Sequence, residues 1–455
     1  MRSYELKPTY ENLLSTYLDD TIARDRDIHR FIEILNAVDD CCSIALDGAW
    51  GSGKTFFVKQ VKMIVDAYND FLSSVNSNDK EQIKDQWKKY HNEEEAELQT
   101  QVCVYYDAWE NDNDDDPILS LVYSIMQSID TDFTLSKGAN CLTIAATLLD
   151  IFSGKKWTQL VSAFNSDDPL AELRASKNIK GIIDEFLNSL LEERGNRLII
   201  FIDELDRCKP DYTVRVLERI KHYFSNDRIT FVFSTNINEL QHTIKKCYGD
   251  SFNACKYLDR LFDLRVTLPP ADLQRYYQSI KFNSSYYTFD IVTDAVIKTY
   301  HFELREIAKY IRLTKVIAYN PTHSDKYRLG ISFQFGLLYI TPIMIGLKVL
   351  DTDRYNNFIQ GKDYTPMIEI SYCLREKFFS DLLNKDETFD SSDSSGLKIV
   401  TLEDKLKEVY EALFVQTYNN ETYRIKIGEY FFDQNSKNLL LNVAGGLSKY
   451  ANYNL

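Results

Sequence analysis

The sequence has few of the residues that hold small secreted or metal-bound domains together. Its eight cysteines contain no C-x-x-C pair, and its six histidines are scattered along the chain without completing a ligand set with cysteine. No secretory leader is recognisable. We therefore expect reduced thiols, a cytoplasmic location and no zinc site.

Excess positive charge and long apolar runs are also missing. The chain has 53 basic and 68 acidic residues, a formal net charge of −15, which argues against broad coating of nucleic acid or anionic lipid. Residues 329–347 carry no charge, but Ser332, Gln334 and Pro342 favour a buried helix over a membrane span. The apolar run 141–152 is too short to span a bilayer, so we expect no transmembrane helix.

What the sequence does contain is a regular alternation of apolar and helical segments. At 455 residues the chain exceeds the limit of about 250 to 300 residues for a single core, so we expect two domains. Strands are predicted at 42–47, 101–109, 197–207, 228–236 and 263–270. Their alternation with helices predicts an α/β fold with a parallel sheet flanked by helices.

The domain boundary is expected where the apolar strands stop. We predict a first domain over residues 1–270, with helical insertions at about 70–100 and 130–190. The first insertion is rich in charge and is expected to be an exposed excursion. Residues 271–455 contain no further apolar strand series and are predicted to form a helical lid and C-terminal domain.

A glycine-rich stretch, "DGAWGSGKTFF" at 47–57, joins the first strand to a helix and matches G-x-x-x-x-G-K-[ST]. Glycines let backbone N–H groups turn toward an anion, Lys54 would reach the β- and γ-phosphates, and Thr55 would ligate Mg²⁺. The expected nucleotide-binding residues are Gly48, Ala49, Trp50, Gly51, Ser52, Gly53, Lys54, Thr55 and Phe56. A plain glycine-rich turn is the alternative, so a second motif is needed.

The second motif is an acidic pair that ends the apolar run "LIIFIDE". Asp203 is expected to hold Mg²⁺, and Glu204 to orient or deprotonate an attacking water, which favours hydrolysis over binding alone. The next strand ends at Asn236, which would position that water or else cap the following helix. Together the two motifs predict ATP and Mg²⁺ as ligands.

Four segments resemble the KAP family of P-loop NTPases, in the additional-strand, catalytic-glutamate group. They are "GAWGSGKTFFVKQV" (48–61), "YYDAWENDNDDDPILSLVYSI" (105–125), "LIIFIDELDRCKPDYTVRVLERIKHYF" (198–224) and "YLDRLFDLRVTLP" (257–269). The resemblance covers about residues 20–315. It implies a sheet ordered 5-1-4-3-2, with ATP above the carboxyl ends of the strands.

The resemblance also implies roles for several charged residues, each with a simpler alternative. Asp206 and Arg207 match the family's Asp-Arg pair, or else form a salt bridge at the start of a helix. Arg260 suits sensing of the γ-phosphate, within one chain or across a subunit boundary, and Arg305 resembles a lid arginine; both equally suit surface charges. Arg24 would frame the adenine or simply start a helix.

Bacterial relatives include phage-exclusion proteins and ATPases of antiphage cassettes. The resemblance therefore implies an ATPase that acts as a conformational switch or motor with partner proteins, or as a homo-oligomer, in antiphage defence. The alternative is a nucleotide-gated scaffold whose C-terminal tyrosines bind partner proteins, although ordinary packing also explains them. These tyrosines are Tyr355, Tyr364, Tyr372, Tyr410, Tyr418, Tyr423 and Tyr430. A P-loop kinase and direct nucleic-acid action are weaker hypotheses.

Overall fold

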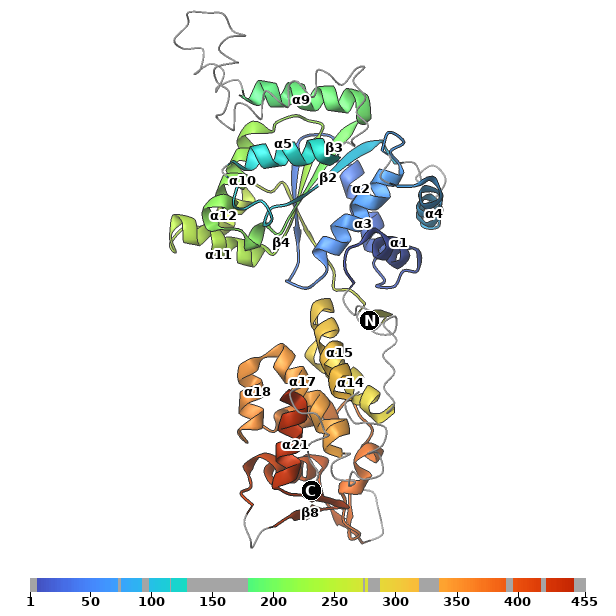
Figure 1. The fold of residues 1–455 in the computed structure, drawn as a ribbon, viewed down its shortest axis with the longest axis vertical. Helices are drawn as coiled ribbons and strands as arrows, with labels where there is room; N and C mark the ends of the chain where they lie inside the picture. The colour runs from blue at the N-terminus through green and yellow to red at the C-terminus, as the bar shows by residue number, and fades with distance from the viewer. Residues whose placement is uncertain are drawn as a thin grey trace, which may run out of the picture. The chain divides into compact units, whose positions relative to one another are not determined.

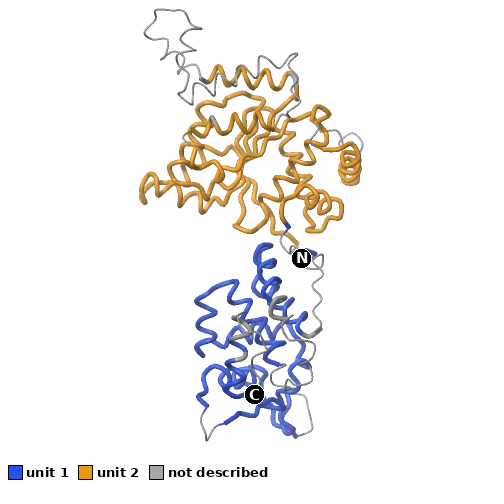
Figure 2. The backbone as a smooth tube through the Cα atoms, in the orientation of Figure 1, with its two compact units in different colours: residues 1–6, 273–455 blue, residues 7–272 orange. Residues whose placement is uncertain are grey.

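Two compact units make up the protein. The computed structural model describes residues 6–72, 75–91, 98–114, 116–128, 179–272, 275–276, 287–318, 335–389, 396–418 and 423–445. One unit comprises residues 7–272 and is called the sheet unit; the other comprises residues 1–6 and 273–455 and is called the helical unit (Figure 2). Most of the predicted insertion at 130–190, including the run 141–152, lies outside the described residues.

A five-stranded parallel sheet forms the centre of the sheet unit (Figure 1). Its strands are β1 (Cys42–Asp47), β2 (Gln101–Asp107), β3 (Arg197–Asp203), β4 (Ile229–Thr235) and β5 (Leu264–Thr267). They lie in the order β2-β3-β4-β1-β5, and every neighbouring pair is parallel. This order confirms the predicted 5-1-4-3-2 arrangement, counted from the other edge.

Helices cover both faces of this sheet (Figure 1). One face carries α1 (Tyr10–Leu18), α2 (Asp25–Asn36), α3 (Lys54–Ala67) and α4 (Ser77–Lys88). The other carries α5 (Pro117–Ser128), α9 (Ile179–Arg194), α10 (Pro210–Tyr223), α11 (Ile237–Tyr248) and α12 (Ala254–Asp259). All seven residues of both β3 and β4 are consequently buried, which explains why their sequences are mostly apolar.

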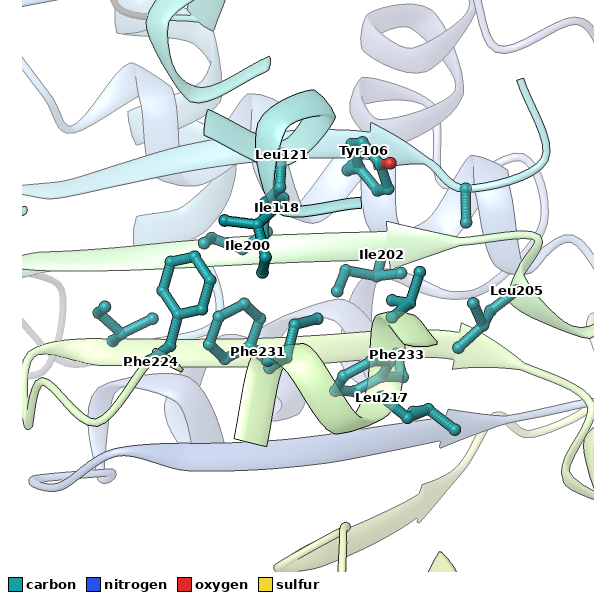
Figure 3. Close-up of a cluster of buried hydrophobic side chains, with 14 of the residues drawn as sticks. Tyr106, Ile118, Leu121, Ile200, Ile202, Leu205, Leu217, Phe224, Phe231 and Phe233 are labelled. Carbon is teal, nitrogen blue, oxygen red and sulfur yellow. The ribbon is translucent and has the colours of Figure 1, made fainter. Parts of the chain in front are cut away.

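The core on the second face is one continuous apolar cluster. Figure 3 shows Ile200 and Phe231 of the central strands with Ile118 and Leu121 of α5 and Leu217 of α10. Each is no more than 2% exposed, and burying one such side chain stabilises the fold by roughly 1.5 to 3 kcal/mol. The cluster holds the strands in a fixed register, which in turn fixes the loops at their ends.

The charge-rich segment predicted as an exposed excursion contains α4, and this helix is packed. Ile83 and Trp87 lie one turn apart and are 0% and 1% exposed. The Trp87 ring stacks on His91 at a centroid distance of 4.1 Å and lies 4.3 Å from His29 of α2. The helix is therefore exposed on one side only, because apolar side chains on the other face suffice to dock an otherwise polar helix.

The helical unit contains helices and two small sheets. Its elements are α14 (Tyr287–Tyr300), α15 (Leu304–Ala318), η2 (Gly336–Ile340), α17 (Thr341–Leu350), α18 (Thr352–Ile359), α19 (Thr365–Ser371), η3 (Glu376–Leu382), β6 (Glu387–Thr388), β7 (Lys398–Ile399), α20 (Leu402–Tyr410), η4 (Glu411–Val415), β8 (Ile425–Ile427), β9 (Tyr430–Phe432) and α21 (Gln434–Gly445). Strands of two or three residues leave no periodic signal in a sequence, so these four strands were not predicted.

The apolar run at 329–347 becomes part of the core of the helical unit where it is described. The π-helical η2 continues into α17, and Ile340, Ile343 and Met344 are fully buried. Across the described ranges, every helix is too short or too polar to traverse a membrane.

Most tyrosines of the helical unit that the structure describes are buried or half-buried. The Tyr410 hydroxyl donates to the Phe358 carbonyl at 2.7 Å, and Tyr410 and Tyr430 are 2% and 6% exposed. Tyr372 and Tyr423 are the exceptions, at 78% and 71% exposed. The set predicted as a binding surface is thus divided between the interior and the exterior.

A buried histidine makes the stability of the sheet unit depend on pH. His29 is 3% exposed, and its Nε2 lies 2.8 Å from the Tyr17 hydroxyl. Burial, with a contribution from His91, lowers the pKa of His29 to about 3. The pKa of Asp25 shifts in the opposite direction: burial raises it to about 7, although Asp25 accepts a hydrogen bond from Gln86.

We predict that His29 opposes folding increasingly as the pH falls. Unfolded histidine titrates near pH 6.5, whereas folded His29 stays neutral down to about pH 3, so its contribution to the free energy of unfolding drops by roughly 2 kcal/mol between pH 7 and pH 5. Asp25 acts in the opposite direction, so the measurement compares variants. In urea unfolding, the wild type should exceed His29→Gln in free energy of unfolding by less at pH 5 than at pH 7, and the difference between the two pH values should equal that amount. The same gap at both pH values would contradict the prediction.

Candidate functional site

The loop between β1 and α3 contains the glycine-rich motif. Gly51 and Gly53 have φ angles of 87° and 91°, which glycine adopts without steric cost. A Cβ atom on Gly48 would lie 2.9 Å from Ser52 Oγ, so the loop folds tightly on itself. The buried Ser52 hydroxyl has no hydrogen-bond partner within the described part of the chain. Because no side chain caps the start of α3, its first N–H groups are available to an anion.

Lys54 begins α3, and its ammonium group is enclosed by the loop. Its Nζ donates to the carbonyls of Gly48 and Ala49 at 2.7 and 3.1 Å, and the residue is 9% exposed. Burial lowers the pKa of Lys54, while nearby Asp206 and Asp203 act to raise it. The cation is therefore buried, held by the loop and close to the acidic residues that follow β3.

The acidic pair stands at the carboxyl end of β3. Asp203 is 1% exposed; its Oδ2 accepts from the Tyr105 hydroxyl at 2.9 Å, and its Oδ1 from the Glu204 N–H at 3.0 Å. The Glu204 carboxylate pairs with Arg207 Nε at 2.5 Å. Burial raises the pKa of Glu204, as does Asp203, while Arg207 opposes the shift.

The loop and the acidic pair lie at the same edge of the sheet. Asp47, which precedes the loop, is in register with Thr235 of β4, and Asp203 is in register with Ser234. Only β4 separates the two strands that carry the motifs. Carboxyl ends of parallel strands are where α/β folds commonly bind ligands.

One carboxylate links the three strand ends. Asp206 Oδ2 accepts the indole N–H of Trp50 at 2.6 Å and the backbone N–H of Asn236 at 3.2 Å. Asp206 is 7% exposed, so these hydrogen bonds stabilise a carboxylate that would otherwise be buried without partners. The geometry thus brings together Trp50, Lys54, Asp203, Glu204 and Asn236.

Asn236 serves as a helix cap. Its side-chain oxygen accepts the N–H groups of Asn238 and Glu239 at 3.1 and 3.4 Å, which caps α11. The contacts of the Asn236 side chain are therefore those of a helix cap, one of the two roles predicted for it. The residue also lies beside the acidic pair, so a second role in positioning water stays a prediction.

Arg24 occupies the N-cap position of α2 and is 1% exposed. Its Nη2 donates to the Pro269 carbonyl at 2.7 Å, just beyond the carboxyl end of β5. Arg24 therefore starts a helix, which agrees with the simpler alternative. It also lies at the carboxyl edge of the sheet, the edge where the glycine-rich loop is found. Whether Arg24 contacts adenine stays a prediction.

The structure does not bring Arg260 to the loop. Arg260 is exposed and ends α12, and three residues later the Asp263 N–H donates to Ser43 at the start of β1. It therefore lies at the amino end of the strands, whereas the loop follows their carboxyl end. Arg305 is exposed on α15 of the helical unit, and its role stays a prediction.

Several contacts at the site were missed by the sequence analysis. Tyr105, near the end of β2, contacts Asp203, and the Trp109 ring lies 5.7 Å from the Arg207 guanidinium carbon. Both residues lie at the end of a predicted strand, in the segment 105–125 that resembles the KAP family, but neither was assigned a role. Side-chain direction and cross-strand neighbours depend on the sheet order, which the spacing of motifs does not encode.

The residues fit a magnesium nucleotide. The loop offers backbone N–H groups, a buried unpartnered hydroxyl and a cation, while Thr55 and Asp203 supply the oxygen donors that Mg²⁺ prefers. Within the described ranges, no three His, Cys, Asp or Glu side chains are grouped to hold a metal on their own. Magnesium held mainly by phosphates does not need such a group.

Comparison with known proteins agrees with this geometry. The sequence model described as KAP family P-loop domain matches residues 24–284, more than half of the chain. An uncharacterized protein of Methanocaldococcus jannaschii is 37% identical over 76 residues, which are 16% of this chain and 39% of that protein. The ORC2 protein of Aeropyrum pernix, solved as ADPNP–ADP complexes, aligns over 93% of both chains with 11% identity and a TM-score of 0.33, too low to support a conclusion. The family match spans the loop, the sheet and the acidic pair, and the chain belongs to the KAP family of P-loop NTPases.

Proposed function

We propose that the protein binds ATP with Mg²⁺ and hydrolyses the terminal phosphate. The observation that carries this proposal is the convergence of the Lys54 loop and the Asp203–Glu204 pair on one edge of the sheet, joined through Asp206. Membership of a P-loop NTPase family supports the same conclusion. A plain glycine-rich turn would not need a buried cation facing a carboxylate pair.

Each residue has a role that follows from its position. The loop N–H groups and Lys54 would bind the phosphates, and Thr55 with Asp203 would hold the metal. Mg²⁺, when bound, offsets the negative charge that develops on the phosphates. Glu204 would accept the proton of the attacking water, with Asn236 helping to orient that water. Arg24 would contact the adenine.

Removing the buried cation should weaken nucleotide binding. We predict that Lys54→Ala lowers the affinity for a fluorescent ATP analogue at least tenfold, because the phosphates lose a cation in a site that excludes water. Lys246→Ala, which removes an exposed lysine from α11, is the matched control and should bind like the wild type. Equal affinities for all three proteins would show that the phosphates bind elsewhere.

Changing the proposed base should separate binding from turnover. Glu204→Gln keeps the size and planar end of the side chain, but its amide group cannot accept the proton of water. We predict unchanged ATP affinity and a fall in turnover of about 100-fold or more, the range expected for loss of a general base. Phosphate release and equilibrium binding measure the two quantities. Turnover at the wild-type rate would remove Glu204 from this role.

We assign Arg260 to a neighbouring copy of the chain rather than to its own nucleotide. The loop and Arg260 are separated by the length of β1. This strand has six residues and is about 20 Å long, which exceeds the reach of an arginine side chain. A γ-phosphate contact by Arg260 therefore requires a second subunit, so the active form would be a homo-oligomer.

Mixing variants tests this assignment. Arg260→Ala retains its own loop, and Lys54→Ala retains its Arg260, so neither alone should turn over ATP. We predict that mixing the two restores a measurable fraction of wild-type activity, because mixed assemblies contain one intact site. Wild-type turnover by Arg260→Ala alone would contradict any role of Arg260 at the γ-phosphate.

The wider role follows from the family resemblance. We propose that ATP binding and hydrolysis switch the protein between conformations, with Arg305 on a lid in the helical unit, and that partner proteins use this switch in antiphage defence in the cytoplasm. The rival scaffold hypothesis is weakened by the burial of Tyr410 and Tyr430. A scaffold would bind its partner proteins on ATP binding and act normally in Glu204→Gln, whereas a switch that depends on hydrolysis would stall in that variant.

A further inference from the structure

The turn that follows the acidic pair brings an arginine back onto Glu204. Residues Leu205–Arg207 form the 3₁₀ turn η1, and this turn places Arg207 Nε 2.5 Å from Glu204 Oε2. The side chains of Glu204 and Arg207 are 18% and 26% exposed, so water screens the pair only in part. An ion pair at this spacing is short enough to fix the direction of the carboxylate.

The backbone of Glu204 is held in an unfavourable conformation. Its φ of 59° lies in the left-handed region, which is unfavourable for a non-glycine residue and persists where surrounding contacts enforce it. Those contacts are present: the Glu204 N–H donates to Asp203 Oδ1, and the Glu204 carbonyl accepts from the Arg207 N–H at 3.1 Å. Such conformations cluster at reacting groups, and here the constrained residue is the proposed base.

Trp109 supports the arginine from a neighbouring strand. The Arg207 guanidinium carbon lies 5.7 Å from the centre of the Trp109 ring, within the range of a cation–π contact. The loop that carries Trp109 is itself attached to β3 and its turn, since the Ala108 N–H donates to the Asp203 carbonyl at 3.0 Å and Lys209 Nζ donates to Asn113 at 2.6 Å. The orientation of Arg207 is therefore set by two strands.

The charges around Glu204 explain why this support is needed. Asp203, Asp206 and Asp107 all act on Glu204 as like charges. Repulsion of this kind would turn a free carboxylate toward solvent, away from the loop. Arg207 is the cation that directly contacts the Glu204 carboxylate and opposes that movement.

We propose that Arg207 is the positioning residue of the reaction: it holds the Glu204 carboxylate in the orientation from which it acts on water, while Trp109 keeps the guanidinium group in place. This inference rests on the proposed hydrolysis of ATP. The same contact has a rival interpretation, in which Arg207 restrains Glu204 and slows turnover, and the direction of the rate change separates the two.

The test combines kinetics with chemical rescue. Arg207→Ala should lower kcat at least tenfold while KM and the affinity for a non-hydrolysable ATP analogue stay within twofold, because the phosphates do not depend on Arg207. Arg207→Lys should be intermediate, since it keeps the charge without the planar fork. Millimolar guanidinium ion should restore part of the turnover of Arg207→Ala and saturate, which a merely structural defect would not show.

Arg215→Ala is the matched control. Arg215 pairs with the exposed Asp211 at 3.2 Å and lies 5.8 Å from the Tyr212 ring, so it has the same two kinds of contact away from the site. Its loss should leave kcat unchanged and show no response to guanidinium. In a Glu204→Gln background, Arg207→Ala should cause no further loss of residual turnover, because Arg207 acts through Glu204.

The outcomes distinguish this inference from the proposed function. A wild-type chain without ATP turnover would overturn the hydrolysis proposal and, with it, the role of Arg207. Turnover that depends on Glu204 but is unchanged or faster in Arg207→Ala would overturn the positioning role alone. The positioning role would also be overturned if Arg207→Ala lowered turnover by the same factor in the wild-type and Glu204→Gln backgrounds. Should Arg207→Ala not fold, a wild-type kcat in folded Arg207→Lys at unchanged KM would count against the proposal.

Discussion

Parallel pairing of β1 with β4, and of β4 with β3, is the constraint on which the site depends. The glycine-rich loop and the acidic pair are about 150 residues apart in sequence. They meet because backbone hydrogen bonds align the three carboxyl ends and an apolar core on the sheet prevents the strands from sliding. A shift of register by one residue would turn Asp203 away from the loop. The geometry of the site therefore depends on the packing of apolar side chains along these strands.

Within this frame, the site is a set of opposed buried charges. Lys54 loses hydration when it is buried, and the carboxylates of Asp203, Asp206 and Glu204 compensate for part of that loss. The carboxylates repel one another and need donors of their own, which Trp50 and Arg207 supply, among others. The hydrogen bonds from Trp50 and Arg207 thus satisfy carboxylates that in turn balance the buried charge of Lys54. These contacts connect the ends of β1, β3 and β4 into one hydrogen-bonded network.

The sheet also separates the proposed site residues into two groups. Lys54 and Glu204 lie at the carboxyl edge, whereas Arg260 lies at the amino edge, next to the start of β1. A single chain of this topology presents its glycine-rich loop on one edge and the exposed side chain of Arg260 on another. Repeating the chain in one direction would bring the two edges together, which is the arrangement expected of a head-to-tail assembly. The strand order and the position of α12 set this polarity.

The sequence by itself determined the loop, the acidic pair, the alternation of strands and helices and, through family resemblance, the strand order. These features are local, because a glycine at a positive φ, a lysine at the start of a helix and an apolar strand each leave a pattern within ten residues. Only the tertiary structure decided the packing of α4, the capping role of Asn236, the remote position of Arg260 and the contacts of Arg207 with Glu204 and Trp109. Those depend on which side chains neighbouring strands and turns bring within a few ångströms, and sequence spacing does not specify that.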